Sequence, residues 1–224
     1  SLRKQLVLEP GQRVEVAFIT LFATSDEKLR SLINTYNDFN ASMRAIEVAW
    51  TYSHLQLRHL KIHQEDAQTF QQLAGKIIYP QKKFRTIPDR LKKNKLHQSD
   101  LWAFGISGDL PIIVVTVGDI QDLTFVKEML VAHTFLNMRG LKCDLIFLNE
   151  EATAYEQPLK SQISRFIQAH LQHAEMEKGG QVFLLGLDQM SDDHMNLILS
   201  VAKIVLVAAR GDLKGQLASD SAVF

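Results

Sequence analysis

Residues Leu101 to Val117 read LWAFGISGDLPIIVVTV, a glycine-rich stretch that runs directly into six β-branched residues. Such a run is typical of a strand buried on both faces of a parallel sheet. The glycines could cradle a phosphate, but they precede the strand, whereas the glycines of the Rossmann fingerprint follow one. Gly105 and Gly108 are therefore predicted to adopt positive φ in a tight corner. Asp109 is expected to cap nearby amides there, and Pro111 to open the strand.

The residues after this corner alternate between strand-like and helical blocks. Three more apolar runs follow, at 143–148, 182–187 and 204–208. Amphipathic helical patterns separate them, at 119–138, from Pro158 and from Ser191. The last run fits either a strand or the end of the preceding helix. Because strands joined by helices of this length form a parallel sheet through right-handed crossovers, residues 101–224 are predicted to form a Rossmann-like, three-layer α/β module.

The first 23 residues carry a different pattern. Apolar and polar side chains alternate on both sides of Pro10-Gly11, which predicts a β-hairpin over residues 1–23. Because two strands alone bury too little surface to be stable, this hairpin is expected to belong to a larger sheet.

Residues 24–100 are predicted to be a helical segment. Apolar residues at helical spacing indicate three helices packed together within 24–79, and the spacing of Thr24 and Glu27 fits a capping box. One stripe of the second helix is expected to face the core, and its members are Met43, Ile46, Trp50, Leu57 and Leu60. Residues 81–95 hold seven Lys or Arg and one acid, which indicates an exposed basic linker.

Composition limits the possible classes of function. Lys+Arg and Asp+Glu are both 25, and a net charge of zero argues against a dedicated nucleic-acid-binding protein. No apolar run reaches the roughly 18 residues of a membrane-spanning helix, so a soluble chain is expected. The single cysteine, Cys143, lies within an apolar run, where a buried thiol is common. The chain begins Ser1-Leu2-Arg3-Lys4 without an initiator Met and is interpreted as a piece of a longer polypeptide.

No catalytic residue, metal ligand or cofactor site is predicted. The spacing of His59 and His63 would suit a metal on one helix, but the H-E-x-x-H pattern is absent, so these histidines are interpreted as surface or packing residues. The candidate binding residues are Trp102, Asp109 and Asp119. An aromatic face such as that of Trp102 can stack on a sugar ring, although packing is the simpler explanation.

A binding site at the carboxyl ends of the strands is the alternative that these residues leave open. Parallel sheets bind ligands at that edge, where Val117-Gly118-Asp119 and Asn149-Glu150 would form the rim. The ligand of such an independent module would be a sugar or a nucleotide.

The order of the segments resembles a known family. The stretches LVLEPGQRVEVAFITLFA, AIEVAWTYSHLQLRHLKI, QEDAQTFQQLAGKIIYP and QSDLWAFGISGDLPIIVVTVGD follow one another as in the C-terminal region of cyclic β-1,2-glucan synthases. That region is similar to glycoside phosphorylases of the cellobiose phosphorylase type. KCDLIFLNE and GQVFLLGLDQMSDDH continue the match, so the resemblance covers nearly the whole chain.

The resemblance implies a large, multi-domain bacterial parent at the inner membrane. A glycosyltransferase domain of such a parent makes β-1,2-glucan from UDP-glucose, and a phosphorylase-like region trims the glucan or sets its length. The hairpin would end a β-sandwich, and the helical segment would join it to a helical barrel that holds the catalytic acid and the phosphate site. This chain ends before such a barrel, so no catalytic residue is carried over to it.

The resemblance therefore implies a non-catalytic structural module, inactive alone, on the cytoplasmic side of the membrane. Its partners would be other domains of the same polypeptide and β-1,2-glucan, with no cofactor, no nucleic acid and no membrane span of its own.

Overall fold

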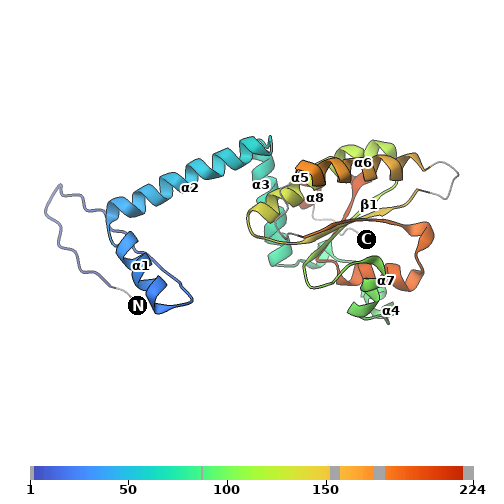
Figure 1. Cartoon of the computed structure of the whole chain (residues 1–224), viewed down its shortest axis with the longest axis horizontal. Coiled ribbons are helices and arrows are strands. Elements are labelled where there is room, and N and C mark those ends of the chain that lie inside the picture. The colour runs from blue at the N-terminus through green and yellow to red at the C-terminus, as the bar shows by residue number, and fades with distance from the viewer. Residues whose placement is uncertain (1–2, 87, 152–156, 174–179, 219–224) are drawn as a thin grey trace. The chain divides into compact units, whose positions relative to one another are not determined.

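The computed structural model describes residues 3–86, 88–151, 157–173 and 180–218 (Figure 1). The chain divides into two compact units, Ser1–Lys61 and Ile62–Phe224. The second unit holds the sheet, and the first holds helices and extended chain.

The second unit is built on a four-stranded parallel sheet, as predicted. Its strands are β1 (Ile112–Val117), β2 (Asp144–Asn149), β3 (Val182–Gly186) and β4 (Ile204–Val207), in the order β3-β2-β1-β4. Ile113 pairs with Leu145 on one side and with Ile204 on the other. All residues of β1 and β2 are buried, which explains their β-branched and apolar composition. The run at 204–208 is therefore a strand and not the end of a helix.

Helices cover both faces of this sheet. They are α3 (Gln64–Ile78), α4 (Pro88–Lys93), α5 (Leu123–Met138), α6 (Pro158–His173), α7 (Asp192–Val201) and α8 (Leu213–Ala218). Strands β1 to β3 advance in one direction, whereas β4 returns to the other side of β1, so right-handed crossovers place α5 and α6 on one face and α7 on the other. Helices α3 and α8 pack with α5, and α4 packs with α7 (Figure 1). The predicted small α/β domain is confirmed.

The first unit contains α1 (Asp26–Tyr36), α2 (Phe39–His59) and an extended segment before them. The turn at Pro10-Gly11 is formed: Gly11 has a φ of 84°, and the Gln12 N–H donates to the Glu9 carbonyl over 3.0 Å. The predicted β-hairpin is wrong, however, because no strand is present among residues 3–23. The first unit contains no strand with which these residues pair, and two strands alone do not bury enough surface.

The predicted packing of three helices is correct only for the first two. Helix α1 packs on α2 and begins after Ser25, whose hydroxyl accepts from the Lys28 N–H, so Thr24 is not the capping residue. Helix α3 belongs to the second unit, where the rings of Phe70 and Phe135 lie 5.6 Å apart. Within the first unit, nothing covers the apolar stripe of α2, and Trp50 is 64% exposed, so the expectation that this stripe faces a core is wrong for this unit.

The basic segment 81–95 packs on the α/β unit. It contains a short 3-10 helix, η1 (Lys82–Phe84), and α4. The ring of Phe84 is buried, and the Arg85 guanidinium donates to the Ser200 carbonyl over 3.0 Å. The limits of the three segments expected from the sequence stay predictions.

Candidate functional site

The glycine-rich corner before β1 has the backbone that its sequence predicts. The 3-10 helix η2 (Gln98–Phe104) ends at Gly105, which has a φ of 73°, and Gly108 has a φ of 76°. A Cβ atom at Gly108 would lie only 2.9 Å from Cγ of Gln98. The space beside Gly108 is therefore filled by the side chains of Gln98 and Leu101.

Trp102 and Asp109 lie together at this corner. The Trp102 indole is 66% exposed, and its Nε1–H donates to the Ser107 carbonyl over 3.4 Å. The Gln98 amide donates both to that carbonyl, over 2.9 Å, and to Asp109 Oδ1, over 3.1 Å. Asp109 thus accepts from a nearby side-chain amide, and the Ser107 hydroxyl accepts from the Asp109 N–H over 3.2 Å. The corner thus presents an exposed aromatic face beside a carboxylate.

Asp119 lies at the opposite end of β1, where the carboxyl ends of the strands meet. It starts the 3-10 helix η3 (Ile120–Asp122), where its Oδ1 accepts from the Gln121 N–H over 2.9 Å. The six residues of β1 separate it from Asp109, a distance of about 20 Å at the usual strand rise. The structure therefore brings two of the three candidate residues together and not the third.

The exit of β1 is fixed by Asp122, a residue that the sequence reading missed. Its side chain is 8% exposed, and Oδ2 accepts from the N–H groups of Gly118 and Asp119 over 3.0 and 3.1 Å. The spacing of Asp119 and Asp122 is that of a capping box, which is the signal that could have identified the pair.

The carboxyl edge of β2 is also acidic. The buried Asn149 side chain accepts from the Glu151 N–H, and the Glu151 carboxylate accepts from Leu159 and Lys160 in the first turn of α6. A Cβ at Gly118 would lie 3.5 Å from Oε2 of Glu150, so these carboxylates gather where β1 and β2 end. Since like charges repel, this edge disfavours the phosphates of a nucleotide.

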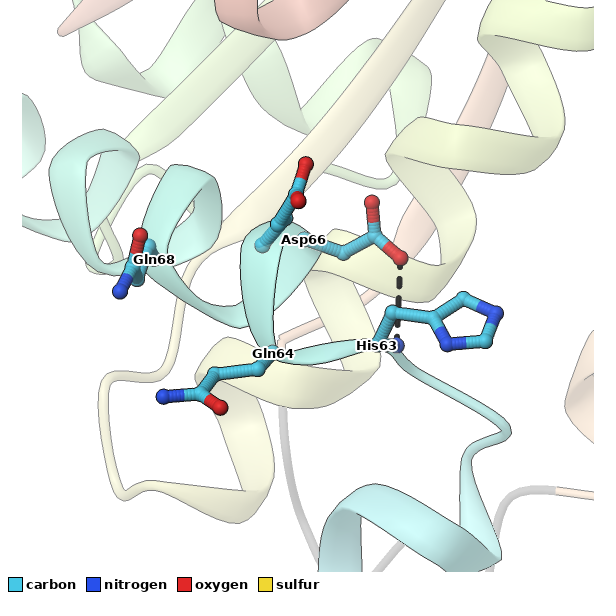
Figure 2. Close-up of a pocket in the computed structure, with 5 residues that line it drawn as sticks. His63, Gln64, Asp66 and Gln68 are labelled. Carbon is cyan, nitrogen blue, oxygen red and sulfur yellow. Dashed lines mark hydrogen bonds between the residues drawn. The ribbon is translucent and has the colours of Figure 1, made fainter.

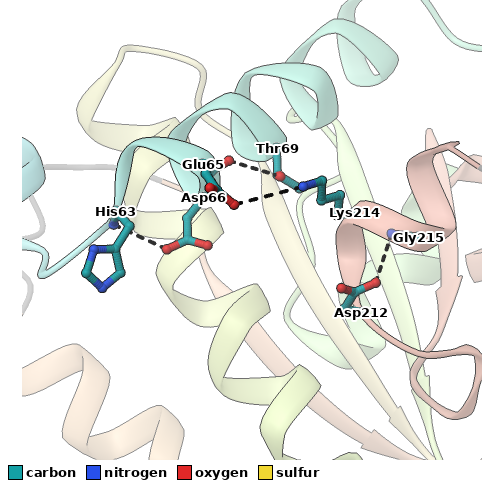
Figure 3. A network of polar contacts seen from close by, with 7 residues as sticks. All are labelled: His63, Glu65, Asp66, Thr69, Asp212, Lys214 and Gly215. Atoms are coloured by element: carbon teal, nitrogen blue, oxygen red, sulfur yellow. Dashed lines mark hydrogen bonds and ion pairs between the residues drawn. The ribbon is translucent and has the colours of Figure 1, made fainter.

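A polar network joins the start of α3 to the start of α8 (Figure 3). Glu65 lies 4.0 Å from the Lys214 ammonium, and the Asp212 carboxylate accepts from the Gly215 N–H over 2.9 Å. Beside them, burial raises the pKa of Glu128, although a hydrogen bond from the Leu213 N–H opposes the rise. Of these contacts, the exposed Glu65–Lys214 pair links α3 to α8, and the Glu128 bond links α5 to α8.

The pocket at the start of α3 is shallow and belongs to this network (Figure 2). It is lined by His63, Gln64, Glu65, Asp66 and Gln68, all of them exposed. The His63 N–H donates to the Asp66 carboxylate over 3.2 Å, as a helix cap does. His59 ends α2, so the two histidines do not share one helix. Among the described residues, no three metal-ligating side chains lie close enough to hold an ion.

The buried titratable groups His133, in α5, and Cys143, directly before β2, serve packing. Burial lowers the pKa of His133 to about 4, although its ring nitrogen lies 2.8 Å from the Cys143 carbonyl oxygen. Its neutral ring therefore donates this hydrogen bond at pH 7. Burial also raises the pKa of the Cys143 thiol to about 12, with a smaller contribution from Asp144. A thiol that stays protonated is a poor nucleophile, which agrees with the interpretation of Cys143 as a core residue.

Comparison with known proteins identifies a similar sequence. The chain is 29% identical over 226 residues to the cyclic β-(1,2)-glucan synthase NdvB of Rhizobium meliloti (strain 1021). The match covers the whole chain and 8% of the length of that protein. No family model matches the chain. The resemblance drawn from the order of the motifs is confirmed by this similarity. Along the described part of the chain, no helix has both the length and the apolar character needed to cross a bilayer.

Proposed function

We propose that this chain is a non-catalytic structural module of a longer, β-1,2-glucan synthase-like polypeptide, in which residues 3–61 pack against other domains. The observation that carries the proposal is the absence of a core in this segment: no described residue of 3–61 is buried. Seven large apolar side chains are more than 60% exposed, namely Val7, Phe18, Phe22, Ile46, Val48, Trp50 and Tyr52. Exposed apolar surface of this extent marks a site of contact with another protein surface.

Helix α2 presents apolar side chains in two opposite directions. At 100° per residue, Ile46 and Trp50 lie on one side of the helix, whereas Val48, Tyr52 and Leu55 lie on the other. A helix that is apolar on both sides is stable when surfaces cover both. Full burial of each large apolar side chain contributes about 1.5–3 kcal/mol, so docking between two domains would stabilise this helix substantially.

The similarity to a glucan synthase supports the identity of the parent polypeptide. The chain spans 8% of the length of that relative, and the proposed parent makes β-1,2-glucan from UDP-glucose at the inner membrane, with this segment on the cytoplasmic side. The corner of Trp102 and Asp109 would form part of a wall that contacts the glucan, because an indole face and a carboxylate suit the C–H groups and hydroxyls of a sugar. The acidic carboxyl edge argues against the alternative of a nucleotide-binding module.

The size of the native polypeptide tests the proposal directly. An antibody raised against this chain should detect a species several times larger than 25.4 kDa in lysates of the source cells. The same species, captured by the antibody from detergent-treated membranes, should convert labelled UDP-glucose into a β-1,2-glucan. A native species of 25.4 kDa that accumulates without a larger precursor would refute the proposal.

A ligand titration separates the structural module from its alternative. The isolated chain should show no saturable binding of UDP-glucose in calorimetry. Saturable binding that is lost in Asp119→Ala would instead support an independent module with its site at the carboxyl edge of the sheet.

A further inference from the structure

The basic segment 81–95 gives one side of the α/β unit a strong positive charge. It holds seven Lys or Arg and one acid, which is a net charge of +6, and because the whole chain is neutral, the other residues together carry −6. The segment is fixed on the α/β unit, where η1 packs on β4 and α4 packs on α7 (Figure 1). Its charge therefore belongs to a defined surface and not to a free linker.

Three consecutive side chains attach the segment to the sheet. Phe84 and Thr86 are buried, and between them the Arg85 guanidinium donates to the Ser200 carbonyl over 3.0 Å. Ser200 lies in the last turn of α7, shortly before β4 begins. The other end of the segment leads into η2 and the corner of Gly105, which precedes β1. Both ends of the segment therefore lie at the amino edge of the sheet, where the strands begin.

Exposed lysines gather at this amino edge. Lys142 precedes β2 and Lys203 precedes β4, so the turns that enter these strands add to the charge of the segment. Six exposed lysines, which we call the basic edge, are Lys82, Lys92, Lys93, Lys95, Lys142 and Lys203. Among the described residues, no carboxylate forms an ion pair with any of the six. The acid Asp109 lies at the same edge, where it accepts from the Gln98 amide.

The carboxyl edge of the sheet has the opposite charge. Asp119 and Glu150 are exposed there, where β1 and β2 end. The six residues of β1 separate the two edges by about 20 Å at the usual strand rise. Charges in physiological salt are screened over about 8 Å. An anionic surface in contact with the basic edge would therefore be attracted by the lysines and hardly repelled by the acids.

Exposed apolar side chains accompany the lysines. Ile78 and Tyr79 come shortly before the segment and are 55% and 76% exposed, and Leu91 in α4 is 37% exposed. Tyrosine is enriched at membrane interfaces, and apolar side chains next to lysines insert between lipid headgroups. The backbone of a nucleic acid is contacted by charged and polar groups, for which apolar side chains are of no use. The surface therefore fits a bilayer better than a nucleic acid.

We propose that the basic edge binds the surface of an anionic phospholipid bilayer, with Ile78, Tyr79 and Leu91 among the headgroups and with the acidic edge facing away from the lipid. The lysines attract the lipid phosphates, and no part of the contact spans the membrane. This inference goes beyond the proposed function, which concerns protein contacts of residues 3–61, and it does not depend on the identity of the parent polypeptide.

Co-sedimentation of the purified chain with lipid vesicles tests this surface. Vesicles of phosphatidylglycerol and phosphatidylcholine should bind the chain. Vesicles of phosphatidylcholine alone, which measure binding through the exposed apolar residues of 3–61, should bind it at least about tenfold more weakly. Raising the salt concentration to about 1 M, where screening acts over about 3 Å, should release the chain from the anionic vesicles.

Charge reversal at two exposed lysines locates the contact. Each Lys near an anionic membrane contributes about fivefold to affinity, so Lys92→Glu together with Lys93→Glu should weaken binding to the anionic vesicles by at least about tenfold. Lys92→Arg together with Lys93→Arg keeps the charge and should retain affinity. Lys28→Glu together with Arg30→Glu, at two exposed cations of α1, changes the net charge by the same amount and should bind as the wild-type chain does.

Several results would overturn the proposal. They are equal binding to the two kinds of vesicle, an equal loss in the Lys28 and Arg30 control, or displacement of the chain from anionic vesicles by DNA at the same phosphate concentration. A dimer in solution that the Lys92 and Lys93 charge-reversal variant does not form would also overturn it and would assign the basic edge to the acidic edge of a second copy. None of these results changes the size of the native polypeptide, so the proposed function is tested separately.

Discussion

Replacing Gly108 by alanine should destabilise the α/β unit more than the same change at Gly105. Both glycines have nearly the same φ, 76° and 73°, so alanine meets the same backbone strain at each position, about 1–2 kcal/mol. Their surroundings differ. A Cβ at Gly108 would lie 2.9 Å from Cγ of Gln98 and 3.0 Å from Cδ1 of Leu101, whereas a Cβ at Gly105 has its nearest neighbour at 4.0 Å.

The difference between the unfolding free energies of the two variants therefore measures only the cost of the steric contacts of the added Cβ. Overpacking of this kind costs about 1–3 kcal/mol, so we expect Gly105→Ala to cost about 1–2 kcal/mol and Gly108→Ala about 2–5 kcal/mol. The larger loss is a considerable part of the total stability of a domain of this size.

Urea unfolding followed by tryptophan fluorescence provides the assay. The chain has two tryptophans, and Trp50→Phe leaves Trp102, at the corner itself, as the single probe. Trp50 is 64% exposed, so this background change should alter stability by less than about 0.5 kcal/mol. Equal unfolding free energies for the two alanine variants, or a larger loss for Gly105→Ala, would refute the reasoning.

Three further predictions concern the buried polar groups and the first unit. In the folded chain the pKa of His133 is about 4, below the ordinary value of 6.5. The unfolded chain therefore binds a proton here before the folded chain does, and the free energy of unfolding should fall by up to about 3 kcal/mol as the pH falls from 6.5 to 4. His133→Gln should abolish that part of the pH dependence. The measurement is the free energy of unfolding in urea, compared between the wild-type and variant chains at each pH. Asp122→Ala should cost about 1–3 kcal/mol, because the partly buried N–H groups of Gly118 and Asp119 lose their acceptor, whereas Asp122→Asn should recover part of the loss; equal losses would contradict the role of its oxygen. Trp50→Lys should leave the thermal unfolding of the isolated chain unchanged but lower the amount of intact polypeptide in cells, measured by immunoblot against Glu47→Lys as control; unchanged amounts would contradict docking through α2.

The α/β sheet could be predicted from the sequence because its determinants are local. A run of six β-branched residues is compatible with few structures other than a buried strand, and glycines beside it signal a turn whatever the rest of the fold is. The positive φ of Gly105 and Gly108 follows from the same local sequence. The buried place of Cys143 follows from the apolar run around it.

Whether the first 23 residues pair as strands could not be predicted from their local sequence. Alternating side chains show that a segment is suited to a sheet, but a strand exists only where another strand accepts its hydrogen bonds. The first unit contains no such neighbour for residues 3–23, and Val7 and Phe22 are 85% and 87% exposed. The same limit applies to α3, because an amphipathic pattern shows that a helix has a buried face and not which surface covers it.

The sequence by itself therefore determined the strands, the corner before β1 and the family that the chain resembles. Only the tertiary structure decided which side chains meet. The length of β1 separates Asp119 from Asp109, whereas the turn of the corner brings Asp109 beside Trp102. Helices α3 and α8, which are far apart in the chain, pack together, and no local pattern specifies such a contact. The physical reason is that backbone conformation depends mainly on neighbouring residues, whereas a site depends on the packing of distant ones.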